Sequence, residues 1–164
     1  MKTQRLAVVL AALTCVLAMR PSVSAAPEHA TLPYPEGYRA WQHVKSGLIG
    51  PAHKRFQSVG GFQHVYANSQ ATQGYRTREF PEGSVIVFEW LEMTEKDGAY
   101  AEGPVRRVDL MIKSAQRYAS TGGWGFQSFV KSTTEPVADF KPQDCFDCHQ
   151  KLAKDGLVLS QYRQ

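Results

Sequence analysis

Short stretches in the middle of the chain alternate apolar and polar residues, which is the pattern of β-strands that bury one face. The strongest stretch, 84–92, is rich in valine, isoleucine and aromatic residues, which favour strands. We expect strands over four ranges: 62–67, 84–92, 105–112 and 124–130. The dipeptide Asp97-Gly98 predicts a hairpin turn between the second and third of them.

Helical spacing flanks this strand-rich region. Apolar residues at positions 38, 41, 44 and 48 predict a helix over 38–48. Two further helices are expected over 113–119 and 142–154, and a polar segment after the first strand leads to a turn at 80–83. Strands in the middle with helices around them indicate an α+β fold, built on an antiparallel β-sheet with flanking helices and a C-terminal helix. A four-helix bundle is excluded, because Phe80-Pro81, Gly103-Pro104 and Gly122-Gly123 interrupt the long helices it would need.

The first 25 residues have the order of features that marks a secretory signal peptide. Lys2 and Arg5 form a basic start, and the apolar run from Leu6 to Met19 ends before the small residues Val23-Ser24-Ala25. That run has 14 residues, fewer than the roughly 20 that a membrane-spanning helix needs. We therefore expect a signal peptide over 1–25, one exported domain over 26–164, and a periplasmic location.

Cleavage of the signal changes the charge of the protein. The whole chain has 19 basic and 15 acidic residues. The signal holds three of the basic residues and no acid, so 16 basic residues remain against 15 acids and the net charge is near +1. A nearly neutral domain gives no indication of binding to nucleic acid or to an anionic membrane surface.

The motif Cys145-Phe146-Asp147-Cys148-His149 carries the clearest chemistry in the sequence. Two thiols three residues apart on one helical turn can form thioethers with the two vinyl groups of a haem, and the following histidine can bind the iron. A redox disulfide would be expected after a strand in a βαβ unit, and a zinc site would need two further ligands of similar spacing. We therefore predict one covalently attached haem c, held by Cys145 and Cys148, with His149 as the iron ligand and 142–154 as the haem-attachment helix.

The other side of the iron lacks an obvious ligand. No methionine follows His149, whereas Met93 and Met111 lie upstream in strand-like runs where methionine usually packs in the core. His43 and His53 are expected to be structural or exposed. An open sixth position favours binding of small molecules over simple electron transfer.

Several stretches, taken in order, resemble the cytochrome P-460 family, which includes the cytochromes c′-beta. They are Tyr38-Arg39-Ala40-Trp41, His43-Val44-Lys45-Ser46, Val65-Tyr66-Ala67-Asn68, Phe80-Pro81-Glu82-Gly83-Ser84-Val85, Met111-Ile112-Lys113, Gly122-Gly123-Trp124-Gly125-Phe126 and CFDCH. The resemblance covers about 38–162 and implies a mainly antiparallel sheet, a five-coordinate haem on His149 and often a homodimer.

The resemblance implies one of two chemistries. Enzymes of the P-460 type tie a lysine to the porphyrin edge and oxidise hydroxylamine with the help of a distal carboxylate, whereas cytochromes c′-beta lack the tie and bind NO and CO in an apolar pocket. The position of the tied lysine corresponds to Phe88 here, and no lysine lies between Arg55 and Lys96. The carboxylate position corresponds to Asp109, a possible distal acid or base; a surface carboxylate paired with Arg106 or Arg107 is the alternative.

The expected function is therefore a periplasmic mono-haem cytochrome, closer to cytochrome c′-beta, that binds NO or CO under a distal cap formed by Phe88. Phe56 or Phe62 could supply a second ring. A hydroxylamine or other nitrogen-oxide oxidoreductase that uses Asp109 is the first alternative, and an electron carrier with an unidentified redox partner is the second.

Overall fold

The computed structural model describes residues 31–162, so the signal peptide predicted over 1–25 lies outside the described residues. Five antiparallel strands form one sheet in which each strand lies beside the next one along the chain. Their bounds are Gln42–Ile49 (β1), Gly61–Ala67 (β2), Val85–Lys96 (β3), Ala99–Lys113 (β4) and Trp124–Val130 (β5). All four predicted strands are confirmed, although β3 and β4 extend beyond the predicted ranges and β1 was not expected.

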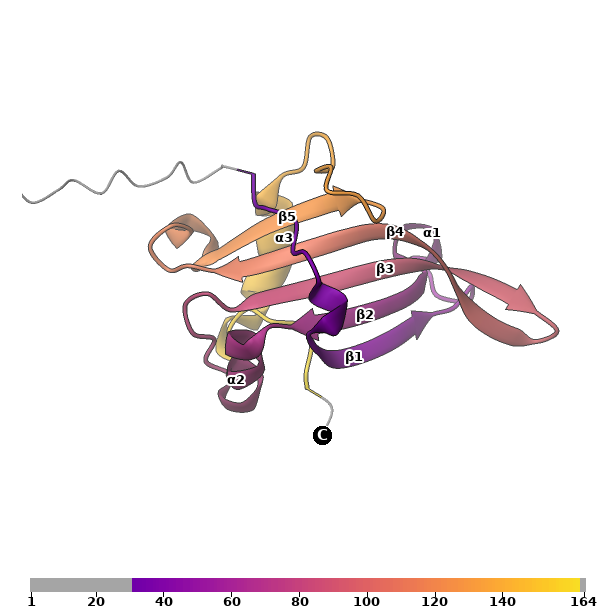
Figure 1. Ribbon diagram of the computed structural model, residues 1–164, viewed down its shortest axis with the longest axis horizontal. Coiled ribbons are helices and arrows are strands. Elements are labelled where there is room, and N and C mark those ends of the chain that lie inside the picture. The colour runs from indigo at the N-terminus through magenta and orange to yellow at the C-terminus, as the bar shows by residue number, and fades with distance from the viewer. Residues whose placement is uncertain (1–30, 163–164) are drawn as a thin grey trace, which may run out of the picture.

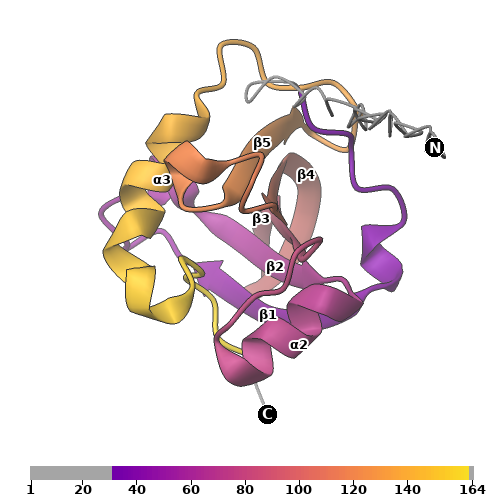
Figure 2. The ribbon, with the colours of Figure 1, turned by 90° about the vertical axis from the view of Figure 1, so that its left-hand side faces the viewer.

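Short helices lie around this sheet. They are the 3-10 helices Tyr38–Ala40 (η1), Ala119–Thr121 (η2) and Gln150–Asp155 (η3), and the α-helices Phe56–Val59 (α1), Ser69–Thr77 (α2) and Pro142–His149 (α3). Figure 1 shows the strand order and Figure 2 shows α3 on one side of the sheet and the N-terminal segment with η1 on the other. The predicted α+β class with an antiparallel sheet is confirmed.

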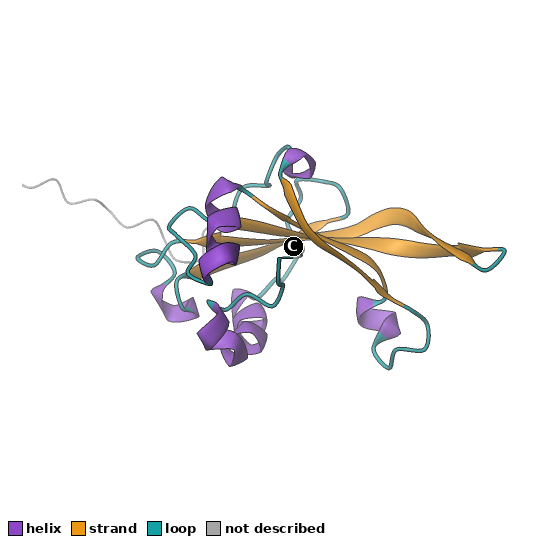
Figure 3. Ribbon diagram, turned by 90° about the horizontal axis from the view of Figure 1, so that it is seen from below, coloured by secondary structure: helices purple, strands orange, loops and turns teal. Residues whose placement is uncertain are grey.

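The β3–β4 hairpin is the longest feature of the sheet. Its turn is at the predicted Asp97-Gly98, where both residues have positive φ angles of 55° and 78°. Glycine and aspartate tolerate this left-handed backbone, which matches the twist of the two strands. Viewed edge-on, the hairpin extends well past the other strands (Figure 3).

The helix predicted over 38–48 is wrong. Only 38–40 is helical, as η1, and the rest is β1. A bulge between His43 and Lys45 interrupts the register of β1 against β2. An extra residue in a strand shifts the side-chain alternation by one position, so the apolar residues of η1 and a bulged strand together imitate helical spacing.

Two further sequence expectations are corrected. The segment 114–118 forms turns that end in η2 instead of the helix predicted over 113–119. The polar segment after β2 contains α2, which begins at an N-cap where Asn68 accepts a hydrogen bond from the Ala71 main-chain NH at 2.9 Å. Its buried face consists only of Ala71, Gly74 and Tyr75, too little apolar surface to produce a clear periodic signal.

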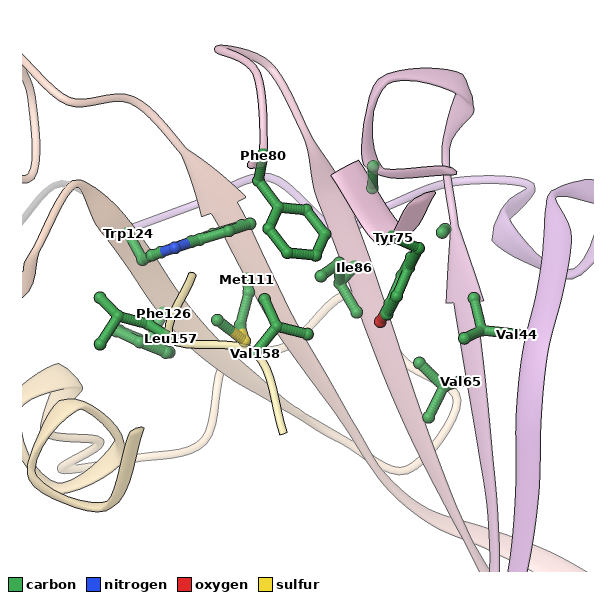
Figure 4. Packing of buried hydrophobic residues seen from close by; sticks show 12 residues of the cluster. Val44, Val65, Tyr75, Phe80, Ile86, Met111, Trp124, Phe126, Leu157 and Val158 are labelled. Atoms are coloured by element: carbon green, nitrogen blue, oxygen red, sulfur yellow. The ribbon is translucent and has the colours of Figure 1, made fainter. Parts of the chain in front are cut away.

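The sheet separates two hydrophobic clusters, because successive residues of a strand point to opposite faces. On the face toward η1, Val87 and Val108 pack with Tyr38 and Phe129. On the face toward α3, Ile86 and Met111 pack with Trp124 and with Val158 near the C-terminus (Figure 4). The second cluster borders the functional cavity described below.

No helix among the described residues is long and apolar enough to cross a membrane.

Candidate haem-binding site

Cys145, Cys148 and His149 of the CFDCH motif lie on α3, which begins at Pro142. Proline is well suited to this position because the missing NH would have no helical partner. Residues three and four positions apart share one face of a helix, so Cys148 and His149 both lie on the side of Cys145. From Gln150 the chain continues as the 3-10 helix η3. The helical segment predicted over 142–154 is therefore confirmed.

The ring of His149 is held in one orientation. Its Nδ1 lies 2.7 Å from the main-chain oxygen of Leu157 and donates a hydrogen bond to it, which leaves Nε2 free to bind a metal. Phe126 packs edge-on against the imidazole at 5.4 Å between ring centroids. Burial lowers the pKa of His149, so the neutral imidazole that metals require is favoured.

The two cysteines are free thiols in different surroundings. Cys145 is half-buried and Cys148 is exposed. Burial, with a smaller contribution from the charge of Asp109, raises the pKa of Cys145 to about 11. A neutral thiol is a poor partner for thiol–disulfide exchange, which does not favour a redox disulfide at this motif.

A cavity of about 510 Å³ opens beside these residues. This volume is in the range of small-molecule and cofactor sites. Its wall joins α3 and the C-terminal segment to all of β1–β5, and it contains all five residues that the sequence pointed to: Phe88, Asp109, Cys145, Cys148 and His149. The structure thus brings together residues that lie up to 61 positions apart in the chain.

A row of paired residues crosses the sheet at the cavity, and four of its five members line the cavity wall. Lys45 pairs with Val65, Val65 with Phe88, Phe88 with Asp109 and Asp109 with Ser128, one residue from each strand. Paired residues on neighbouring strands lie on the same face of a sheet. Phe88 and Asp109 therefore point toward the same side as their cross-strand neighbours.

Trp90 and Phe126 are the other aromatic rings of the wall besides Phe88, and neither Phe56 nor Phe62 lines the cavity. Phe62 pairs with Leu91, which has the opposite parity to Phe88 and so points to the other face. Trp90 lies two residues after Phe88, and their ring centroids are 4.9 Å apart. The period-two alternation of β3 was the signal that could have identified it.

Asp109 is tied to the sheet by several donors. Its carboxylate accepts hydrogen bonds from Trp90 Nε1 at 2.7 Å, from Arg107 Nε at 3.1 Å and from the Ser128 hydroxyl. The predicted pairing with Arg107 is present, yet the same carboxylate lines the cavity. A carboxylate has about four lone-pair sites, so these donors occupy most of its capacity.

The family model of cytochrome P460 matches residues 35–160. The chain belongs to the cytochrome P460 family. No curated protein shows significant sequence similarity to it. The matched range contains the complete sheet and the CFDCH motif, so this member of the family is a haem protein.

The residues around the cavity of this cytochrome P460 family protein fit a haem. One imidazole presents a free Nε2, two free thiols stand three residues apart beside it, and the remaining wall is mainly apolar. A c-type haem would be held by groups of this kind, with Cys145 and Cys148 forming the thioethers and His149 binding the iron.

Met111 lies in the cavity wall, whereas Met93 and His43 lie outside it. Met111 lines the cavity, but it pairs across the sheet with Phe126 and packs in the cluster beside Val158. Met93 lies in the projecting hairpin away from the cavity. The exposed His43 bonds to Ser46, whereas His53 is exposed at the cavity rim.

Proposed function

We propose that this protein is an exported, periplasmic c-type cytochrome with one haem that binds NO or CO at an open iron position. Cys145 and Cys148 attach the haem, and His149 is the only protein ligand of the iron. In this respect it belongs with the cytochromes c′-beta of its family. A homodimer is part of this proposal, because such dimers are common among the proteins it resembles.

The observation that carries the proposal is the aromatic pair Phe88 and Trp90 on the cavity wall. Phe88 occupies the position at which the resemblance places the tied lysine of the hydroxylamine-oxidising enzymes. A phenyl ring cannot form that tie, so the haem keeps ordinary c-type electronics. An apolar wall disfavours water and polar ligands and admits neutral diatomic molecules, which need few hydrogen bonds.

Several residues of this chain support gas binding at the proposed iron site. The Leu157 carbonyl orients His149 and leaves Nε2 as the nitrogen that would bind the iron. A ferrous haem with an open position supplies the atom to which NO or CO binds. Phe88 and Trp90 exclude water from that position, and Asp109 holds the indole of Trp90 through its hydrogen bond.

Hydroxylamine oxidation is the second candidate, because Asp109 lines the cavity within reach of a small substrate. Its role as a proton relay is opposed by its hydrogen bonds. Trp90, Arg107 and Ser128 all donate to it. These three donors occupy most of the lone pairs through which the carboxylate would contact a substrate.

The absorption spectrum of the purified ferrous protein tests the proposal. We expect an ordinary high-spin ferrous c-type spectrum that changes on addition of CO, together with negligible turnover of hydroxylamine. The strong band after which the family is named, accompanied by substantial hydroxylamine oxidation, would establish the enzyme instead. A low-spin ferrous spectrum that does not respond to CO would favour an electron carrier.

A further inference from the structure

The rim of the haem cavity that is formed by β1 and by the connection from β1 to β2 is basic. Lys45 comes from β1, and His53 and Arg55 come from the connection between β1 and β2. The only acidic residue in the cavity wall is Asp109, which already pairs with Arg107. The rim therefore has a local excess of positive charge on a domain that is otherwise nearly neutral.

The Lys45 and Arg55 cations of this rim have no partner in the part of the chain that the structure describes. Among residues 31–162, neither the Lys45 ammonium nor the Arg55 guanidinium forms an ion pair or a side-chain hydrogen bond. The connection that carries Arg55 is nevertheless ordered by local bonds. The His53 NH donates to the Gly50 oxygen at 3.0 Å, and the Arg55 NH donates to His53 Nδ1 at 3.2 Å.

The basic rim lies away from the cysteines. Lys45 is on the edge strand β1, whereas Arg55 directly precedes α1, which lies beside β4 at the end of the sheet away from α3 (Figure 1). α3 packs against β5, and the charges of Asp109 and Arg107 influence Cys145. Lys45 and Asp109 belong to the same cross-strand row but are three strands apart, which corresponds to roughly 14 Å at about 4.8 Å per strand. The cavity thus has a thiol end at α3 beside β5 and, away from it, the cations of Lys45 on β1 and Arg55 before α1.

We propose that Lys45 and Arg55 bind the propionate carboxylates of the haem. This inference rests on the haem attachment proposed above. The two vinyl groups and the two propionates of a haem lie on opposite sides of the porphyrin, so attachment at Cys145 and Cys148 directs the propionates away from α3. The far end of the cavity then presents two unpaired cations to two carboxylates, and Arg55 can form a bidentate pair.

Such cations affect the redox potential of the iron as well as the position of the haem. Ferric haem carries one more positive charge than ferrous haem, so a nearby cation disfavours the ferric form. Removing Lys45 or Arg55 leaves a propionate charge uncompensated, which stabilises the ferric form and lowers the midpoint potential. Because the rim is exposed, the interaction is screened by salt.

The test is the midpoint potential of the mature holoprotein, measured at low ionic strength. In the double variant Lys45→Gln with Arg55→Gln, we expect the equilibrium between ferric and ferrous haem to shift roughly threefold to tenfold toward the ferric form. For a one-electron couple this corresponds to a decrease in the midpoint potential of about 28 to 59 mV. Lys45→Arg, which keeps the charge, should retain the wild-type potential. Lys54→Gln is the matched control, since Lys54 is exposed, lies between the two rim residues in sequence and does not line the cavity.

Each outcome discriminates between the two proposals. A decrease that is confined to the rim variants and shrinks in 1 M salt, where the Debye length is about 3 Å, supports propionate binding. Haem staining must first show attached haem in each protein. If haem is attached but the rim variants match Lys54→Gln, the propionate assignment is wrong while the haem attachment stands. If the wild-type protein carries no attached haem, both proposals fail.

Discussion

His149 and Leu157 are joined by a 2.7 Å hydrogen bond from the imidazole Nδ1 to a main-chain carbonyl. Leu157 has a positive φ of 65°, and the segment around it is held by Arg78. The Arg78 guanidinium donates to the main-chain oxygens of Asp155, Val158 and Ser160 at 2.9, 3.0 and 3.2 Å. The orientation of the proposed iron ligand therefore depends on an arginine 71 positions earlier in the chain.

Replacement of Arg78 should loosen this support. Arg78→Ala removes part-buried hydrogen bonds from a charged donor to main-chain carbonyls, each worth at most about 3 kcal/mol. We expect the free energy of unfolding in urea to fall by about 2 kcal/mol and the iron–histidine stretching band in resonance Raman to broaden. Arg76→Ala is the control, because Arg76 lies on the same helix but is exposed. Equal effects of the two substitutions would contradict this role of Arg78.

Covalent attachment predicts that haem survives denaturation. After denaturing electrophoresis we expect haem staining of the mature wild-type protein. The double variant Cys145→Ser with Cys148→Ser should lose it, because both thioethers are absent. Single variants should retain one bond and stain weakly. A stain that persists in the double variant would show that the motif is not the site of attachment.

The ferrous iron should be five-coordinate and high-spin, with His149 as its protein ligand. Resonance Raman spectra report the coordination number directly. Met111→Leu is the critical variant because Met111 is the methionine that lines the cavity, and leucine preserves the volume without a sulfur ligand. We expect its spectrum to match the wild type. A low-spin wild-type spectrum that becomes high-spin in Met111→Leu would identify methionine as the sixth ligand.

Phe88 should control entry of gases to the iron. Phe88→Ala opens volume on the cavity wall, and we expect CO and NO to associate on the order of tenfold faster, which corresponds to about 1.4 kcal/mol of barrier. Phe62→Ala is the matched control, because Phe62 lies on the neighbouring strand but points to the other face of the sheet. Association rates that stay unchanged in Phe88→Ala would show that the ring is ordinary core.

Asp109 should act as a support for Trp90. Asp109→Asn keeps the shape of the side chain but removes the negative charge of the group to which Arg107, Trp90 and Ser128 donate hydrogen bonds. We expect a loss of about 1 to 3 kcal/mol in the free energy of unfolding and faster CO association, because the indole is less firmly held. Glu95→Gln, at an exposed position of the projecting hairpin, should change neither quantity. If Asp109→Asn leaves stability intact and abolishes a hydroxylamine activity of the wild type, the carboxylate is catalytic.

The sequence by itself determined the features whose residues are neighbours in the chain. The CFDCH spacing places two thiols and an imidazole on one helical turn whatever surrounds it. The alternation of 84–92 and 105–112 and the Asp97-Gly98 turn specify an antiparallel hairpin, since strand period and turn geometry are local properties. These features were sufficient for the fold class and for the proposed haem attachment.

Only the tertiary structure decided which distant residues share the cavity. Most of 38–48 is the bulged strand β1 where a helix was predicted, and the register after the bulge places Lys45 in the same row as Phe88. Strand register of this kind depends on pairing across the sheet. The partner of His149 is a main-chain carbonyl, which every residue possesses and which therefore leaves no trace in the sequence. Local patterns specify which groups a chain carries, whereas long-range pairing decides which of them face the same cavity.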